Sequence, residues 1–185
     1  MDKGSLLLMS CCAPCSADAI KKLKSEGRDF SVLFYNPNIF PQEEYGRRLA
    51  EQRVLCEKHG AKITAGPWNH KAWLTNMQGL EREPERGARC AKCFALRAAF
   101  GIKFAREYGF PAVASVFGTS PHKDQGQVDA AFRIGPSGLY DNRRFGYLPE
   151  GWMYRQKYCG CEFSETFNAG NKSIANKNNR DGHEN

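Results

Sequence analysis

The amino-acid sequence predicts an α/β fold, a Rossmann-like parallel sheet with helices on both faces. Short apolar runs with the character of strands alternate along the chain with longer segments of helical character, and this alternation is typical of a parallel sheet. With 185 residues and a hydrophobic content of 41%, the chain can bury one complete core. We therefore expect a single domain over residues 1–167. Residues 168–185 are rich in Asn, Lys and Gly and are expected to form a disordered tail.

The first half of the chain is expected to supply three strands and three helices. In chain order these are a strand over 5–10, a helix over 14–25, a strand over 30–35, a helix over 42–59, a strand over 61–65 and a helix over 68–78. Their limits follow from residues that interrupt regular structure. Pro14 favours a helix start directly after the first apolar run. Gly27 and Gly60 mark the ends of the first two helices, and the Asn-Pro-Asn sequence at 36–38 is a turn signal.

The second half is expected to continue the alternation. Leu96, Phe100, Phe104 and Tyr108 recur every four residues ahead of Gly109, which predicts an amphipathic helix ending at that glycine. A run of β-branched and aromatic residues over 111–117 predicts the fourth strand. A further helix is expected from residue 125 to about residue 132, after which Gly and Pro interrupt regular structure.

The cysteines are the main functional signal in this sequence. Seven of the eight fall into three tight groups, at residues 11–15, 90–93 and 159–161. Cys56 stands alone, at helical spacing from Tyr45 and Leu49, and is expected to be a small core residue. The apolar run near the start is too short for a signal peptide or a membrane span, so we expect a cytoplasmic protein without a membrane partner. Clustered cysteines in such a protein typically bind metal or carry out redox chemistry.

Two of the cysteine groups are expected at one edge of the sheet. Residues 11–15 follow the first strand directly, and Cys90 and Cys93 begin the helix that leads to the fourth strand. In parallel α/β folds, ligands bind at the carboxyl ends of the strands. Residues three apart share one face of a helix, and the helix N-terminus favours thiolates. Cys90 and Cys93 can therefore face one ligand.

Three kinds of site fit these cysteines. A four-cysteine zinc site is disfavoured because the two C-x-x-C pairs lie much further apart in the sequence than the roughly 15–20 residues typical of zinc ribbons. A thioredoxin-like pair, Cys12 and Cys15, follows a strand and begins a helix, but it leaves the other groups unexplained. An iron–sulfur cluster held from two helix starts uses the most cysteines, and it is the interpretation that we favour.

The charge of the chain favours a polyanionic partner. The net charge is +7 and the pI is about 9.0, a balance that suits nucleic acid or a phosphate-bearing cofactor. The pairs Arg47-Arg48 and Arg143-Arg144 are candidate phosphate contacts. Candidates for stacking against a nucleic-acid base are Phe34, Tyr35 and Tyr45.

Seven sequence blocks together resemble one known family. In chain order they are CCAPCS at 11–16, FYNPNI at 34–39, EEY at 43–45, GARC at 87–90, CF at 93–94, SPHKD at 120–124 and YRQKYCGC at 154–161. This ordered set is similar to the QueH-type epoxyqueuosine reductases, and the resemblance covers roughly residues 5–167. Between residues 132 and 152 the chain departs from the family pattern, because this stretch is contracted and rich in Gly and Pro.

The resemblance implies a fold, an activity and partners. The fold would be related to the adenine-nucleotide α-hydrolase-like (HUP) folds, with cysteines where the ATP-using relatives bind pyrophosphate. The activity would be the reduction of epoxyqueuosine to queuosine at the wobble position of a tRNA anticodon, with an electron donor that the sequence does not identify. The rival functions are a thioredoxin-like thiol-disulfide oxidoreductase and a zinc-stabilised RNA-binding module.

The resemblance also implies roles for individual residues. The ligands of a 4Fe-4S cluster would be Cys11, Cys12, Cys90 and Cys93. Cys159 and Cys161 would form a redox-active pair that can close as a disulfide. The family is further expected to hold a mononuclear iron beside the cluster, for which Cys15 and Asp124 are the candidate ligands.

Overall fold

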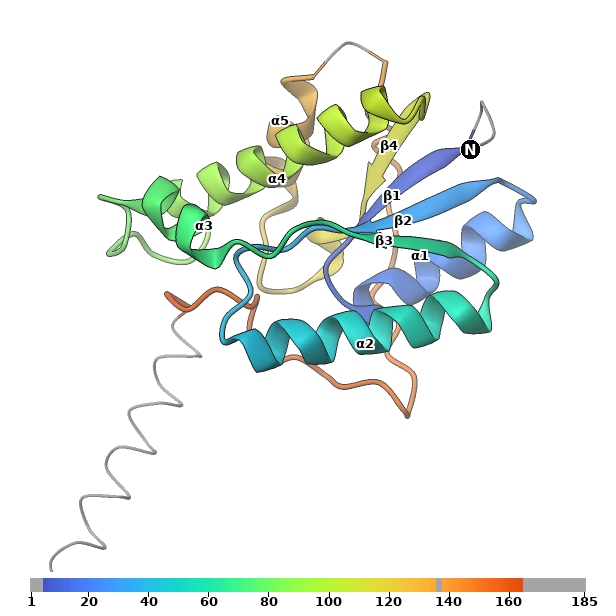
Figure 1. The fold of residues 1–185 in the computed structure, drawn as a ribbon, viewed down its shortest axis with the longest axis horizontal. Helices are drawn as coiled ribbons and strands as arrows, with labels where there is room; N and C mark the ends of the chain where they lie inside the picture. The colour runs from blue at the N-terminus through green and yellow to red at the C-terminus, as the bar shows by residue number, and fades with distance from the viewer. Residues whose placement is uncertain (1–4, 136–137, 165–185) are drawn as a thin grey trace, which may run out of the picture.

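The computed structural model describes residues 5–135 and 138–164 as an α/β domain (Figure 1). Its sheet has four parallel strands in the order β3-β2-β1-β4. The strands are β1 (Leu6–Ser10), β2 (Phe30–Phe34), β3 (Lys62–Ala65) and β4 (Ala112–Ser115). The predicted fold class is therefore confirmed. The predicted tail at 168–185 lies outside the described residues.

Helices cover both faces of this sheet. They are α1 (Ala13–Ser25), α2 (Gln42–Lys58), α3 (His70–Met77), α4 (Ala88–Glu107) and α5 (Gln125–Arg133), with a short 3-10 helix, η1 (Phe117–Thr119). The pair α1 and α2 lies on one face, and the pair α4 and α5 lies on the other (Figure 1). No helix in these described parts of the chain is long and apolar enough to cross a membrane.

Strand β1 is the centre of the core. All five of its residues are buried, and Leu8 lies opposite Val32 of β2 and Ala114 of β4. A strand that is covered on both faces requires a continuous apolar run, and Leu6–Met9 supplies one. Cys56 is fully buried on α2, so the prediction that it is a core residue is confirmed.

The element limits differ from the predicted ones by a few residues, for local reasons. The helix expected over 68–78 begins at His70, because the Asn69 side chain accepts a hydrogen bond from the Ala72 N–H over 3.0 Å and caps it. The strand expected over 111–117 ends at Ser115, since Phe117 already begins η1.

The last described segment, 138–164, carries the chain around the domain with little regular structure. Tyr140 forms an isolated bridge with Val113 of β4, and the Leu148 N–H then donates to the Pro14 carbonyl at the start of α1 over 3.1 Å. Beyond that point the segment runs beside α2 (Figure 1). This path returns the third cysteine group to the carboxyl ends of the strands.

Candidate metal and redox site

The first cysteine group forms a compact buried triad at the start of α1. Strand β1 ends at Ser10, and Cys12 is the N-cap residue of α1. The sulfur atoms of Cys11, Cys12 and Cys15 all lie within 4.8 Å of one another. Three thiols held this closely, at a helix start and away from water, are suited to binding a metal as thiolates.

The pKa values of the three thiols in the triad shift in different directions. Hydrogen bonds from the thiols of Cys12 and Cys15 hold the pKa of Cys11 well below its ordinary value. The ammonium of Lys123 acts in the same direction, since its Nζ lies 3.1 Å from the Cys11 sulfur. Burial raises the pKa of Cys12, and hydrogen bonding to Cys11 raises the pKa of Cys15 to about 12. One thiolate at Cys11 is therefore stabilised before any metal binds.

The other two cysteine groups line one neighbouring cavity. Cys90 and Cys93 face it from the first turn of α4, and Cys159 and Cys161 face it from the last described segment. The Arg86 N–H donates to the Cys90 sulfur over 3.3 Å. Burial raises the pKa of both α4 cysteines, so these thiols require a metal or another positive charge to ionise at neutral pH.

Two residues connect the triad to this cavity. Lys123 contacts the Cys11 sulfur and also lines the cavity that holds Cys90 and Cys93. Cys159 lines the same cavity and the adjoining one, which is lined by Cys12 and Cys15. The three cysteine groups thus adjoin one another. That a single cluster is bound jointly by Cys11, Cys12, Cys90 and Cys93 stays a prediction.

The donor set fits an iron–sulfur cluster chemically. Such clusters are held by cysteine thiolates, and buried thiolates need nearby positive charge. Arg89 and Arg97 of α4 are buried and line the same cavity as Lys123. Among the described residues, the Arg89 Nε and the Asn38 Oδ1 at this cavity have no hydrogen-bond partner. Unpaired buried polar atoms are uncommon, and a bound group would give them partners.

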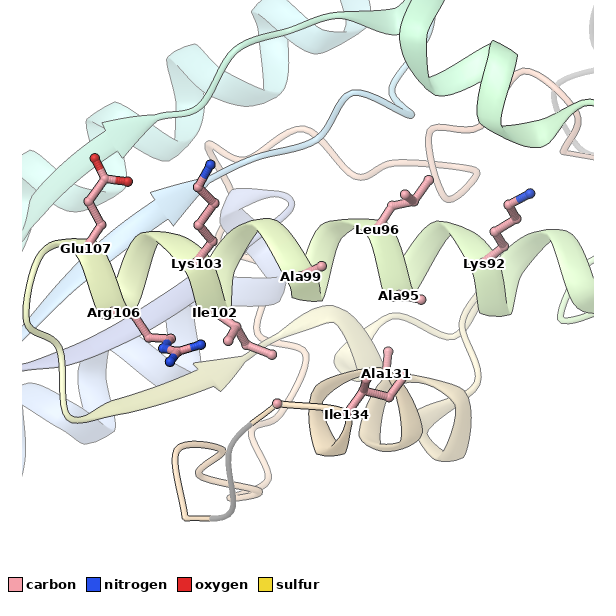
Figure 2. Close-up of a pocket in the computed structure, with 11 residues that line it drawn as sticks. Lys92, Ala95, Leu96, Ala99, Ile102, Lys103, Arg106, Glu107, Ala131 and Ile134 are labelled. Carbon is pink, nitrogen blue, oxygen red and sulfur yellow. The ribbon is translucent and has the colours of Figure 1, made fainter.

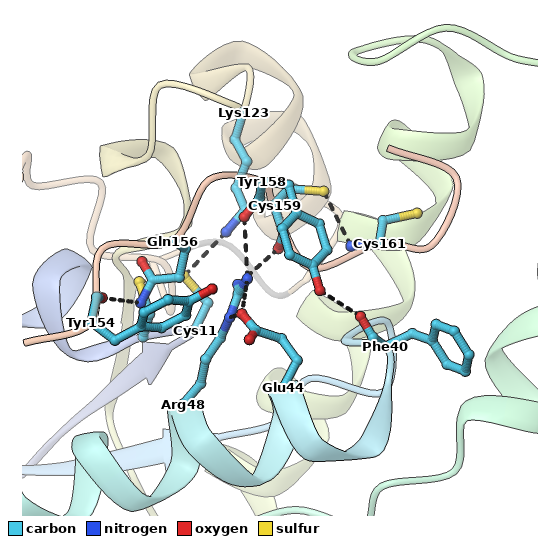
Figure 3. Close-up of polar contacts among 11 residues, drawn as sticks. Cys11, Phe40, Glu44, Arg48, Lys123, Tyr154, Gln156, Tyr158, Cys159 and Cys161 are labelled. Atoms are coloured by element: carbon cyan, nitrogen blue, oxygen red, sulfur yellow. Dashed lines mark hydrogen bonds and ion pairs between the residues drawn. The ribbon is translucent and has the colours of Figure 1, made fainter. Parts of the chain in front are cut away.

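The Cys159-Gly160-Cys161 segment is fixed from several sides (Figure 3). The Arg48 guanidinium donates to the carbonyls of Tyr158 and Cys159 at 3.2 Å each. The Phe40 N–H donates to the Gly160 carbonyl over 2.9 Å, and the Tyr158 hydroxyl donates to the Phe40 carbonyl over 2.6 Å. A segment without helix or strand is therefore held in one position by α2 and the loop before it.

The two cysteines of this segment differ in acidity. A hydrogen bond from the Cys161 thiol lowers the pKa of Cys159 to about 6, and the Cys161 N–H donates to the same sulfur over 3.4 Å. Hydrogen bonding to Cys159 in turn raises the pKa of Cys161. One thiolate beside one thiol is the arrangement found in reactive dithiol pairs.

Asp124, expected from the resemblance to be an iron ligand, also has a role in the fold. It is the N-cap of α5, and its side chain accepts a hydrogen bond from the Gln127 N–H over 2.8 Å. It also lines the cavity that contains the α4 cysteines. Cys15 belongs to the other group, the triad, so a shared iron between these two residues stays a prediction.

The candidate nucleic-acid contacts need correction. Arg48 is only 2% exposed and is ion-paired with Glu44 at 2.6 Å, so it cannot reach a phosphate. Arg143 and Arg144 are paired with Glu26, Asp141 and Asp129. Arg47 is exposed, with its guanidinium 4.8 Å from the centre of the Tyr154 ring.

The candidate stacking aromatics are also engaged within the fold. Phe34 is fully buried, so the expectation that it stacks against a base is wrong. Tyr35 stacks on Phe100 with ring centres 3.7 Å apart. Tyr45 packs edge-on against Phe34, with ring centres 5.5 Å apart. Phe34 therefore lies in the core, whereas Tyr35 and Tyr45 are half-buried and each contacts another ring of the fold.

Three buried arginines of the site were not predicted from the sequence. Arg48, Arg89 and Arg97 are among the largest fully buried side chains of the described residues. Arg97 follows Cys93 by four residues and therefore lies on the same helical face, so the sequence does contain a signal for its place in the site. For Arg48 the sequence offers no comparable signal, because its partners Tyr158 and Cys159 lie more than a hundred residues away.

Comparisons with known proteins point to one family. The sequence model of the family "Epoxyqueuosine reductase QueH" matches residues 6–137. A protein of that name from Histophilus somni is 36% identical over 175 residues, which cover 87% of this chain and 72% of the relative. Its namesake from Haemophilus influenzae is 34% identical over 87% of this chain and 71% of the relative. A third, from Acinetobacter baylyi, is 34% identical over 86% and 79%.

Proposed function

The chain belongs to the epoxyqueuosine reductase QueH family, and we propose that it reduces epoxyqueuosine to queuosine at the wobble position of a tRNA anticodon. The reaction is a two-electron deoxygenation. Both carbon–oxygen bonds of the epoxide break and a carbon–carbon double bond forms. Two electrons and two protons convert the released oxygen to water.

The observation that carries this proposal is the meeting of three cysteine groups at the carboxyl ends of the strands. Cys159 lines both the cavity of the α4 cysteines and the cavity of the triad, with Lys123 between them. Parallel α/β folds bind their ligands at this edge. Thiols that would bind metal and thiols that would exchange electrons are thus adjacent, which supports a reductive enzyme.

We assign the metal-binding role to four of these thiols. Cys11, Cys12, Cys90 and Cys93 would hold a 4Fe-4S cluster, and Cys15 and Asp124 would be the ligands of a mononuclear iron. A 4Fe-4S cluster supplies electrons one at a time when it is bound. The Lys123 ammonium and the buried guanidinium of Arg97 would offset the negative charge of the thiolates, as they already do at Cys11.

We assign the redox role to Cys159 and Cys161. Oxidation of the two thiols to a disulfide releases two electrons and two protons, which is the amount that the deoxygenation consumes. The lowered pKa of Cys159 supports this role, since a thiolate is the species that takes part in exchange. A disulfide across a single intervening residue is strained, and strained disulfides are easily reduced again.

The tRNA substrate is proposed from the family and from the charge of the chain. A net charge of +7 suits a polyanion. Because enzymes that modify a base take it out of the stack, the anticodon base would have to enter a cavity beside the cysteines. His122 and Lys123 line both cavities and are the side chains placed to meet it.

The rival thiol-disulfide oxidoreductase is disfavoured by the triad itself. Its nucleophile would have to be Cys12 or Cys15, both of which are buried with raised pKa values. Such thiols are poor nucleophiles near neutral pH.

Anaerobic purification followed by iron, sulfide and zinc analysis tests the proposal, together with turnover of tRNA that contains epoxyqueuosine, monitored by mass spectrometry of the released nucleosides. We expect about four or more irons per chain and conversion to queuosine. Zinc without conversion would instead support an RNA-binding module. Metal-free protein that exchanges disulfides would support the thiol enzyme.

A further inference from the structure

A groove of about 860 Å³ runs along the outer side of α4, toward the end of α5 (Figure 2). Its apolar lining consists of Ala95, Leu96, Ala99, Ile102, Ala131 and Ile134. Ile134 is 79% exposed, the highest value among the exposed large hydrophobic residues. Apolar side chains gathered along one open groove, with Ile134 at its end, offer apolar contacts to a partner.

The rim of the groove is positively charged. Lys92, Lys103 and Arg106 border it, against the single acid Glu107. All three cations are exposed, and within the described residues none of them takes part in an ion pair. Unpaired positive charge around an apolar floor complements an acidic protein surface.

The groove lies directly outside the redox site. Leu96 lines the groove and also packs against the buried cluster that contains Cys93 and Cys161. The cation Lys92 is the neighbour of Cys93 in the sequence. The same helix, α4, therefore presents its cysteines to the cavity on one side and the groove to the outside on another.

We propose that this groove docks the electron donor, an acidic one-electron carrier protein, an inference that rests on the proposed function. Each reduced carrier would dock, give up one electron and leave oxidised. Two dockings and two protons from water supply what the removal of one epoxide oxygen requires. RNA is a poorer occupant, because a sugar–phosphate backbone would leave the apolar floor and Ile134 without matching contacts.

The test compares two reductants on the iron-loaded enzyme. The carrier probe is an acidic plant-type ferredoxin kept reduced by NADPH and its reductase, and the small reductant is dithionite-reduced methyl viologen. In Lys103→Glu/Arg106→Glu, kcat/KM for ferredoxin should fall by about tenfold or more, in line with the loss of electrostatic steering. Turnover with methyl viologen should be unchanged. Ile134→Ser should also lower kcat/KM for ferredoxin, because an apolar contact with the carrier is lost.

The matched control is Arg53→Glu/Lys62→Glu. It makes the same charge change at exposed positions of α2 and β3, away from the groove, and it should leave the ferredoxin kinetics intact. For the wild type, kcat/KM for ferredoxin should fall as salt rises, since salt screens exposed charges.

Several results would overturn the docking site. These are wild-type enzyme that ferredoxin cannot reduce, an unchanged ferredoxin kcat/KM in the groove variants, weaker tRNA retention by those variants, and a change of sedimentation in Ile134→Ser that reveals a contact between copies of the chain. Failure of the wild type with methyl viologen would contradict the proposed reductase activity instead, so the two failures are distinguishable.

Discussion

The Nη1 of Arg48 donates a hydrogen bond to the Cys159 carbonyl over 3.2 Å, across 111 residues of sequence (Figure 3). The same guanidinium is paired with Glu44, whose Oε1 lies 2.7 Å from its Nε. It also lies over the Tyr158 ring, 5.2 Å from the ring centre. Burying an ion pair costs free energy, and this pair holds the segment that carries Cys159 and Cys161 against α2.

Arg48→Met should destabilise the protein and misplace the cysteine pair. The substitution leaves the Glu44 carboxylate buried without its partner, a change that costs about 3–5 kcal/mol. Urea unfolding should report this loss, and thiol-dependent turnover should fall with it. Arg47→Met is the matched control, because Arg47 is the exposed neighbour.

The double substitution Arg48→Met/Glu44→Leu separates stability from positioning. It removes both buried charges, so much of the lost stability should return. The hydrogen bonds to the carbonyls of Tyr158 and Cys159 stay absent, and thiol-dependent turnover should stay low. Recovery of turnover together with stability would contradict a positioning role for Arg48.

Gly160→Ala should strain the same segment from within. Gly160 has a φ of +105°, and an added Cβ would lie 2.9 Å from the Ile39 Cγ1 and 3.1 Å from the Arg48 Nη1. Strain of this kind costs about 1–3 kcal/mol, so we expect a lower urea midpoint and slower thiol-dependent turnover. Gly151→Ala is the control, because its Cβ would meet nothing within 4 Å. Equal effects at the two glycines would contradict the packing argument.

These features show which parts of the site were predictable. The cysteines at 11–15 and 90–93 could be placed because strand and helix limits are set locally, by residues such as Pro14 and the apolar run of β1. The burial of Arg48 could not be predicted, because it depends on a segment that is distant in sequence and has no periodic pattern. In the sequence alone, the pair Arg47-Arg48 is typical of an exposed basic surface.

The path of the last described segment could not be predicted from the sequence either. Residues 138–164 follow a path set by single contacts, such as the Leu148 N–H to the Pro14 carbonyl and the Tyr154 N–H to Glu51. Contacts of this kind leave no trace in hydrophobic periodicity, which is the signal that predicts helices and strands. The proximity of Cys159 to the α4 cysteines is therefore a result of the tertiary structure alone.

The pH dependence of alkylation should identify Cys159 as the reactive thiol. Its pKa is lowered to about 6 by the hydrogen bond from Cys161. The thiolate is the form that reacts with an alkylating reagent. In metal-free protein, the rate of modification by iodoacetamide should therefore rise with pH through about 6, rather than through the ordinary value near 8.5. Peptide mass spectrometry locates the modified residue.

The control for this measurement is Cys161→Ala. Removing the donor thiol takes away the hydrogen bond that stabilises the Cys159 thiolate, so the midpoint should move to higher pH. An unchanged midpoint would show that another group sets the acidity of Cys159. Cys56→Ala should leave the midpoint unaffected, because Cys56 is buried in the core on α2, where its sulfur accepts a hydrogen bond from the Gln52 side chain.

The last prediction separates the Cys159–Cys161 pair from the proposed metal ligands. The segment that carries Cys159 and Cys161 contains no helix start, whereas Cys12 and Cys90 lie at the N-termini of α1 and α4. Cys159→Ser/Cys161→Ser should therefore keep its iron, visible absorption and tRNA binding. It should lose repeated turnover with a thiol reductant, because no disulfide can form. Reduced methyl viologen should restore some turnover, since it delivers electrons without the pair.

Iron analysis and absorption spectra of two further variants provide the comparison. Cys90→Ser should abolish the visible absorption, and Cys56→Ser should leave it intact. If Cys159→Ser/Cys161→Ser lost its iron as Cys90→Ser does, the pair would have to be counted among the metal ligands. The cavity lined by Cys90, Cys93, Cys159 and Cys161 would then be the metal site itself, and the electrons would have to enter without a dithiol.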